Sequence, residues 1–73
     1  MHSDVLEAKW KKFRKEINYN WNQLSSDEVD EIQGRRDNLV FLLQRKYGYA
    51  RRRAEKEVER VVTEFEDKLR RAS

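Results

Sequence analysis

Residues 6–24 read LEAKWKKFRKEINYNWNQL, and this stretch decides how the chain folds. Its apolar side chains recur at steps of four, three, four, four and three residues: Leu6, Trp10, Phe13, Ile17, Trp21 and Leu24. These steps follow one face of a 3.6-residue helix and show none of the period-two alternation of a strand. Because short helices are marginal alone in water, this apolar face must pack against other parts of the chain.

Two glycines and one capping sequence divide the rest of the chain into further helices. There is no proline, and Gly34 and Gly48 are the only glycines, so each is a natural helix stop. Ser25 and Glu28 have the spacing of a capping box, and Asp4 and Glu7 have a similar spacing at the first helix. The sequence predicts an all-α fold, a compact array of three to four short helices over about residues 4–23, 26–33, 36–47 and 50–70. The expected core consists of Trp10, Phe13, Ile17, Trp21, Leu39, Leu43, Val58, Val61 and Phe65.

Composition restricts the function more than it defines it. Seventy-three residues predict a single domain over residues 1–73 with frayed ends. The absence of cysteine excludes disulfides and thiolate chemistry, and His2 is the only histidine, so we expect no metal, no cofactor and no catalytic site. The longest apolar run, residues 39–43, is far too short for a membrane span, and no secretory signal is visible. We therefore expect a soluble cytoplasmic protein that is not an enzyme.

Several uncommon residues also fall in a recognisable order between residues 10 and 58. They are Trp10, Phe13, Trp21, Leu24, Gly34, Arg36, Asp37, Leu39, Tyr47 and Gly48. This series resembles the CsbD-like family, small bacterial proteins associated with the general stress response. The resemblance implies a small helical fold, a bacterial cytoplasmic location and a role in stress, but no biochemical activity and no catalytic residue to carry over.

The chain departs from the family pattern at three positions. CsbD-like proteins usually have glycine where this sequence has Lys15, Asn22 and Phe41. Phe41 stands beside Leu42 and widens the apolar surface of the third predicted helix. We expect it to enlarge the core; the alternative is an exposed patch through which the protein forms a homo-oligomer.

Charge is distributed unevenly along the sequence. Residues 1–33 hold five basic and seven acidic residues, whereas residues 34–73 hold twelve and seven, which together give the net charge of +3. Three consecutive arginines at a helix start oppose the helix dipole and would suit a phosphate. The residues that would then make weak contacts with an anion or a nucleic acid are Arg45, Lys46, Arg51, Arg52, Arg53 and Arg60.

The simpler interpretation of these cations is a solvated helix face. It predicts i,i+4 ion pairs from Arg51 to Glu55 and from Arg53 to Glu57. Trp10 and Trp21 likewise have two interpretations, because aromatic rings can stack on nucleic-acid bases but here share a stripe with other core residues. We expect both tryptophans to be core residues.

Overall fold

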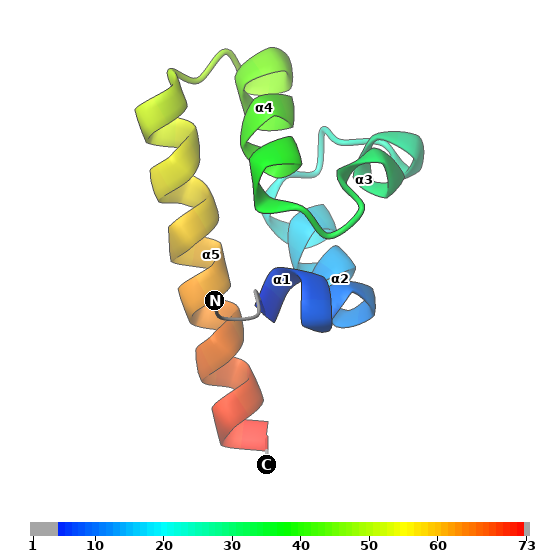
Figure 1. The fold of residues 1–73 in the computed structure, drawn as a ribbon, viewed down its shortest axis with the longest axis vertical. Helices are drawn as coiled ribbons and strands as arrows, with labels where there is room; N and C mark the ends of the chain where they lie inside the picture. The colour runs from blue at the N-terminus through cyan, green and yellow to red at the C-terminus, as the bar shows by residue number, and fades with distance from the viewer. Residues whose placement is uncertain (1–4, 73) are drawn as a thin grey trace.

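The computed structural model describes residues 5–72, which form five α-helices and no strand over that range (Figure 1). The helices are α1 (Val5–Ala8), α2 (Trp10–Asn20), α3 (Ser26–Ile32), α4 (Arg36–Tyr47) and α5 (Arg51–Ala72). The all-α prediction is confirmed, with one helix more than expected. The predicted cap at Asp4, the histidine His2 and the expected fraying of the outermost residues lie outside the described residues.

The long helix α5 organises the others. Figure 1 shows α4 alongside the first half of α5, and α1 and α2 crossing its second half, while α3 packs against α4. The last turns of α5 extend beyond the other helices. No helix between residues 5 and 72 is both long enough and apolar enough to cross a bilayer.

The core lies where these helices meet and is built from almost all of the expected residues. Its buried apolar side chains, each at most 6% exposed, are Leu6, Phe13, Ile17, Trp21, Leu24, Val29, Ile32, Leu39, Val40, Leu42, Leu43, Ala54, Val58, Val61, Val62 and Phe65. The rings of Phe13 and Phe65 meet edge to face, 5.1 Å apart between centroids, and this contact joins α2 to α5. Trp10 is the exception among the predicted core residues, because it is only partly buried at the edge of the cluster.

Local signals in the sequence set the ends of α3 and α4. The Ser25 side chain caps α3 and Glu28 completes the predicted capping box. The helix ends at Ile32, after which Gln33 and Gly34 both adopt left-handed backbone angles, φ 54° and 72°. α4 ends as predicted at Gly48, whose φ is 71° and whose N–H bonds back to the Gln44 carbonyl.

The prediction of one continuous helix over residues 4–23 is wrong, because two helices, α1 and α2, occupy this segment. Lys9 has φ −115° and ψ 37°, outside the helical region, so the chain turns between α1 and α2. The turn lets Leu6 become fully buried although Trp10, four residues later, stays partly exposed. It also places Glu7 against the backbone of Gly34, where an added Cβ atom would lie 3.2 Å from the Glu7 Cα atom. Tertiary packing therefore outweighs a sequence that favours an unbroken helix.

The expectation that Phe41 enlarges the core is also wrong. Leu39, Val40, Leu42 and Leu43 take the buried positions of α4, and Phe41 points away from them with 60% of its surface exposed. A helix packed on part of its circumference cannot bury five consecutive apolar side chains, since successive residues lie about 100° apart.

Candidate binding surfaces

Five of the six predicted anion-contacting cations gather where α4 passes into α5. Arg45 and Lys46 lie in the last turn of α4, and Arg51, Arg52 and Arg53 form the first turn of α5. Arg60 lies seven residues beyond Arg53, about two turns further along α5 and away from this group. The structure thus brings together most of the predicted set and separates Arg60 from it.

Neighbouring carboxylates neutralise three of these six cations. Lys46 Nζ lies 3.0 Å from Glu28 of α3, and Arg51 Nε lies 2.9 Å from Glu55, the predicted i,i+4 pair. The hydrogen bond to Glu55 raises the pKa of Arg51. Arg60 bridges two carboxylates, Glu57 at 3.0 Å and Glu64 at 3.4 Å, and its hydrogen bond to Glu57 is the main reason that its pKa is raised.

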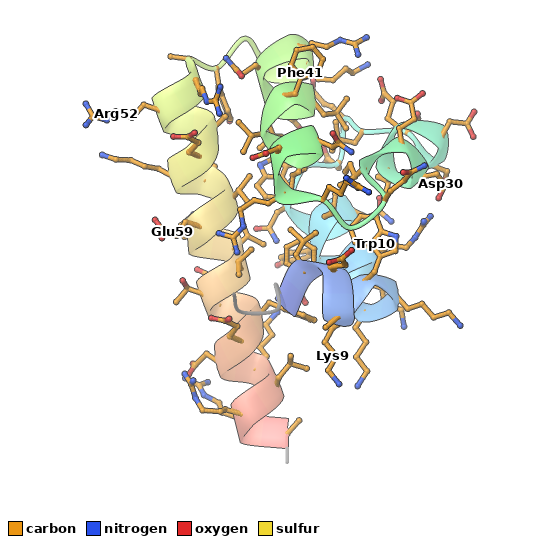
Figure 2. The ribbon with its side chains drawn as sticks, in the orientation of Figure 1. Lys9, Trp10, Asp30, Phe41, Arg52 and Glu59 are labelled. Carbon is orange, nitrogen blue, oxygen red and sulfur yellow. The ribbon has the colours of Figure 1, made fainter. Side chains whose placement is uncertain are left out.

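Two further cations in this set lie over aromatic rings. The Arg53 guanidinium carbon is 4.1 Å from the centre of the Tyr49 ring, so the predicted pair of Arg53 with Glu57 is wrong. The Arg45 guanidinium carbon is 5.7 Å from the centre of the Phe41 ring. Within residues 5–72 only Arg52 of this set has neither a carboxylate nor a ring as a partner, and Figure 2 shows it pointing into solvent.

The tyrosines at the α4–α5 connection have a structural role. The Gln23 N–H donates a hydrogen bond to the Tyr47 hydroxyl at 3.2 Å, which fastens the α2–α3 loop to the end of α4. The rings of Tyr47 and Tyr49 pack with their centroids 5.4 Å apart. The Tyr49 ring in turn contacts the Arg53 guanidinium, so Tyr47, Tyr49 and Arg53 already have partners within the chain.

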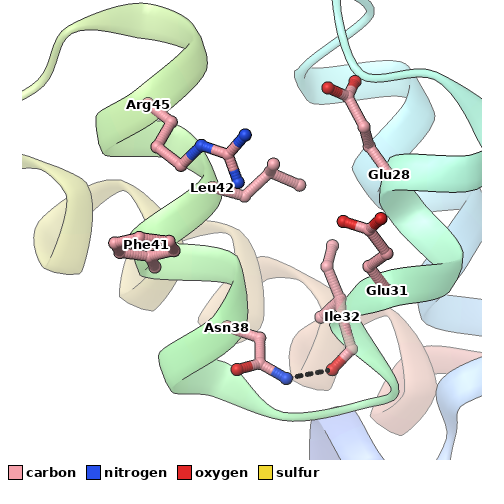
Figure 3. A pocket seen from close by; sticks show the side chains of 7 residues that line it. All are labelled: Glu28, Glu31, Ile32, Asn38, Phe41, Leu42 and Arg45. Carbon is pink, nitrogen blue, oxygen red and sulfur yellow. Dashed lines mark hydrogen bonds between the residues drawn. The ribbon is translucent and has the colours of Figure 1, made fainter.

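A hollow of about 200 Å³ opens between α3 and α4 (Figure 3). We call the residues that line it the Phe41 surface: Glu28, Glu31, Ile32, Asn38, Phe41, Leu42 and Arg45. The Asn38 amide closes its lower end by donating to the Ile32 carbonyl at 3.0 Å. Carboxylates line the α3 side, and an aromatic ring and a guanidinium line the α4 side, as Figure 3 shows.

The carboxylate of Glu28 contacts the residue that caps α3 and a lysine of α4. It accepts a hydrogen bond from the Ser25 N–H at 2.9 Å and lies 3.0 Å from Lys46. These contacts, the Ser25 hydrogen bond first, lower the pKa of Glu28. No group of three or more potential metal-ligating side chains occurs in the part of the chain that the structure describes.

The sequence analysis missed a second basic region. Residues 9–15 contain five cations and no acid: Lys9, Lys11, Lys12, Arg14 and Lys15. The charge balance over residues 1–33 hid these cations, because four of the seven acids in that segment lie in α3. A shorter window of seven residues would have found this cluster.

The remaining motif residues have structural positions. Trp21 and Leu24 are buried, and Arg36 and Asp37 begin α4. Trp21 is 2% exposed, so it cannot serve as a stacking platform, as the core interpretation predicts.

Comparison with known proteins finds relatives along most of the chain. The sequence is 38% identical over 69 residues to a Pseudomonas aeruginosa protein named UPF0337 protein PA4738, covering 94% of this chain and 100% of that one. It is 39% identical over 59 residues to the UPF0337 protein YjbJ of Escherichia coli, covering 81% and 86% of the two chains. It is 40% identical over 58 residues to the UPF0337 protein ECA0631 of Pectobacterium atrosepticum, covering 80% and 84%. No family model matches the sequence, and no solved structure matches it.

Proposed function

Because the chain belongs to the UPF0337 family, which is the CsbD-like family, we propose that it is a non-enzymatic stress-response protein of the bacterial cytoplasm. It acts through contacts with protein chains, and its first partner is a second copy of itself. The observation that carries the proposed contact with a second copy is the exposure of Phe41, 60% of whose surface faces solvent beside a hollow. An exposed phenylalanine costs free energy in water unless a partner covers it.

The chemistry of the Phe41 surface favours a second copy over an unrelated partner. The α3 side carries Glu28 and Glu31, and the α4 side carries Phe41 and Arg45. A twofold interface brings the same surface of both copies together, so the aromatic and basic α4 side of one copy can meet the acidic α3 side of the other. Aromatic residues and arginine are also enriched at protein interfaces.

The size of the molecule predicts a weak dimer. The accessible surface of the chain is 5438 Å², and a standard interface takes about 800 Å² from each partner. Seven residues line the Phe41 surface, whereas a standard interface has about 20–30 residues on each side, so we expect a dissociation constant that is micromolar or weaker.

Sedimentation velocity over a range of protein concentrations tests self-association. We expect the average mass to rise with concentration for the wild type and to stay monomeric for Phe41→Ala. Tyr19→Ala is the matched control, because Tyr19 is an aromatic residue of α2 with 84% of its surface exposed. A wild type that is strictly monomeric at millimolar concentration, or a Phe41→Ala variant that associates like the Tyr19→Ala control, would overturn the proposed dimer.

The absence of enzymatic activity and the role in stress need separate tests. Screens for hydrolase, transferase and metal-dependent activity should find no turnover that a single substitution abolishes. Quantitative mass spectrometry of the host bacterium should show that the protein becomes more abundant after osmotic or acid shock. An unchanged abundance under every stress would contradict the stress-response role.

A further inference from the structure

Within residues 5–72, the largest excess of unpaired positive charge lies at the start of α2, away from the arginines of α5. Among the cations of residues 9–15, Arg14 pairs with Asp30 and lies over the Trp10 ring, with 6.0 Å between its guanidinium carbon and the ring centre. The four lysines Lys9, Lys11, Lys12 and Lys15 are exposed, and no carboxylate of residues 5–72 pairs with them. On α5, by contrast, Arg51, Arg60, Arg70 and Arg71 are held by acids.

This arrangement of lysines is unfavourable for an isolated α2. Lys9 is the N-cap residue and makes no side-chain capping hydrogen bond, and the first turn contains no acid. Positive side chains there oppose the helix dipole, which favours negative charge at this end. Lys11 and Lys15 also repel each other across one turn. A bound anion would relieve both effects, and residues that break local rules in this way are often functional.

A hollow lies among these lysines. It has a volume of about 290 Å³ and is lined by Glu7, Ala8, Lys9, Trp10, Lys11 and Lys12. The partly buried Trp10 ring lines it together with these lysines, and Figure 2 shows Lys9 extending away from the helices. The hollow is open to solvent, so a base can reach the Trp10 ring from outside.

We propose that this Trp10 hollow binds single-stranded nucleic acid, with Lys9, Lys11 and Lys12 on consecutive phosphates and one base against the Trp10 ring. Proteins commonly hold single strands with basic side chains next to an accessible aromatic ring, and Trp10 leaves part of its ring accessible. An anionic membrane surface is a less suitable partner than a nucleic acid. An interfacial helix inserts an apolar face, whereas Phe13 and Ile17 of α2 are fully buried in the core. The site uses none of the residues of the Phe41 surface, so it stands apart from the proposed dimer.

Fluorescence anisotropy of a labelled 12-nucleotide oligothymidylate tests the site, with two variants of equal net charge. Lys9→Gln/Lys11→Gln/Lys12→Gln and Arg51→Gln/Arg52→Gln/Arg53→Gln each remove three positive charges, the first from the start of α2 and the second from the start of α5. Three phosphate contacts predict that wild-type affinity falls about 20-fold between 50 and 200 mM salt. We expect the lysine variant to bind at least about tenfold more weakly at 50 mM and to lose most of this salt dependence. The arginine variant should stay within about threefold of the wild type. Circular dichroism verifies that both variants fold.

Tryptophan fluorescence gives an independent measurement of the base contact. Trp21 is 2% exposed and should not respond, so quenching by the oligonucleotide should come from Trp10 and disappear in Trp10→Phe. Equal weakening in both triple variants, stronger weakening in the arginine variant, or no wild-type binding at 50 mM salt would each overturn the proposal. Lysine-dependent binding to phosphatidylglycerol vesicles without binding to the oligonucleotide would also overturn it and identify a membrane as the partner.

Discussion

The starts of α2 and α3 show two different ways of holding a helix. At α3 the Ser25 N–H donates to Glu28 Oε1 at 2.9 Å and the Glu28 N–H donates to Ser25 Oγ at 3.2 Å, with Asp27 adding negative charge to the first turn. At α2 the first residues are Lys9, Trp10, Lys11 and Lys12, with no side-chain cap and no acid. Local chemistry stabilises the start of α3 and opposes the start of α2.

The difference teaches that α2 depends on tertiary packing. Phe13 and Ile17 are fully buried, and Phe13 meets Phe65 of α5 edge to face. Lys68 of α5 adds an ion pair to Glu16 at 3.1 Å. These contacts compensate for a poor helix start, which leaves the exposed lysines available for another purpose.

The largest effect should come from removing the contact that holds α2. Phe13→Ala should lower the free energy of unfolding by about 3–5 kcal/mol, because it leaves a cavity against Phe65. The control Phe41→Ala removes the same atoms from an exposed position and should stay within about 0.5 kcal/mol. Urea unfolding followed by circular dichroism measures both, and similar losses in the two variants would contradict the packing argument. If Phe13→Ala does not fold, Phe13→Leu supplies a milder version of the comparison.

The next effect concerns the turn that seats α1. Gly34 and Gly48 have nearly equal φ values, 72° and 71°, so alanine at either position should cost about 1–2 kcal/mol in backbone strain. At Gly34 the new Cβ atom also meets the Glu7 backbone at 3.2 Å, whereas nothing lies within 4 Å at Gly48. We therefore expect Gly34→Ala to cost about 1–3 kcal/mol more than Gly48→Ala in urea unfolding. Equal costs would show that α1 moves freely relative to the α3–α4 turn.

A smaller effect should follow from removing the α3 cap. Ser25→Ala should lower the free energy of unfolding by about 1 kcal/mol, since the Glu28 N–H loses its acceptor. Ser26→Ala is the control, because Ser26 is the neighbouring exposed serine inside the helix. A loss as large for Ser26→Ala as for Ser25→Ala would contradict the assignment of the cap.

The same cap predicts how stability depends on pH. Folding lowers the pKa of Glu28 from its ordinary value of 4.5, so its stabilisation is complete above about pH 4.5 and disappears as the pH falls through the lowered pKa. Glu28→Gln should therefore be less stable than the wild type at pH 7, and the difference should shrink in acid. Urea unfolding between pH 7 and 3 measures this, and a difference that stays constant with pH would contradict it.

The smallest effects separate favourable from unfavourable charges. Arg60→Gln loses the contacts with Glu57 and Glu64 and should destabilise the protein by a few tenths of a kcal/mol, about the value of exposed pairs. Lys11→Gln removes repulsion from Lys15 and from the helix dipole and should stabilise by a similar amount. Thermal unfolding at low and high salt checks both signs, because screening should reduce each difference. If both substitutions changed the stability in the same direction, the predicted contrast between the paired charges of α5 and the unpaired lysines of α2 would be wrong.

The fold was predictable wherever a local signal determines a boundary. The capping box at Ser25 and the glycine at position 48 gave the ends of α3 and α4 because each acts within one turn of the helix. The break at Lys9 has no glycine, proline or capping residue to announce it. It arises because α1 packs against α5 and Gly34 approaches Glu7, contacts between residues far apart in the sequence.

The candidate sites were harder to predict than the fold for the same reason. Sequence spacing identified the pair of Arg51 and Glu55 on one helix, but it could not show that Lys46 finds its acid on α3. Nor could it show that Arg53 prefers the Tyr49 ring. Counting charges located the basic residues, and only the three-dimensional pairing distinguished occupied cations from available ones.

The position of α5 determines when this protein can fold during synthesis. Its buried side chains, from Ala54 to Phe65, complete a core that α1, α2 and α4 cannot close without them. The nascent chain therefore keeps its apolar side chains uncovered until residues 54–65 have left the ribosome. A translation product cut short before α5 would remain unfolded and would be a ready substrate for chaperones and proteases.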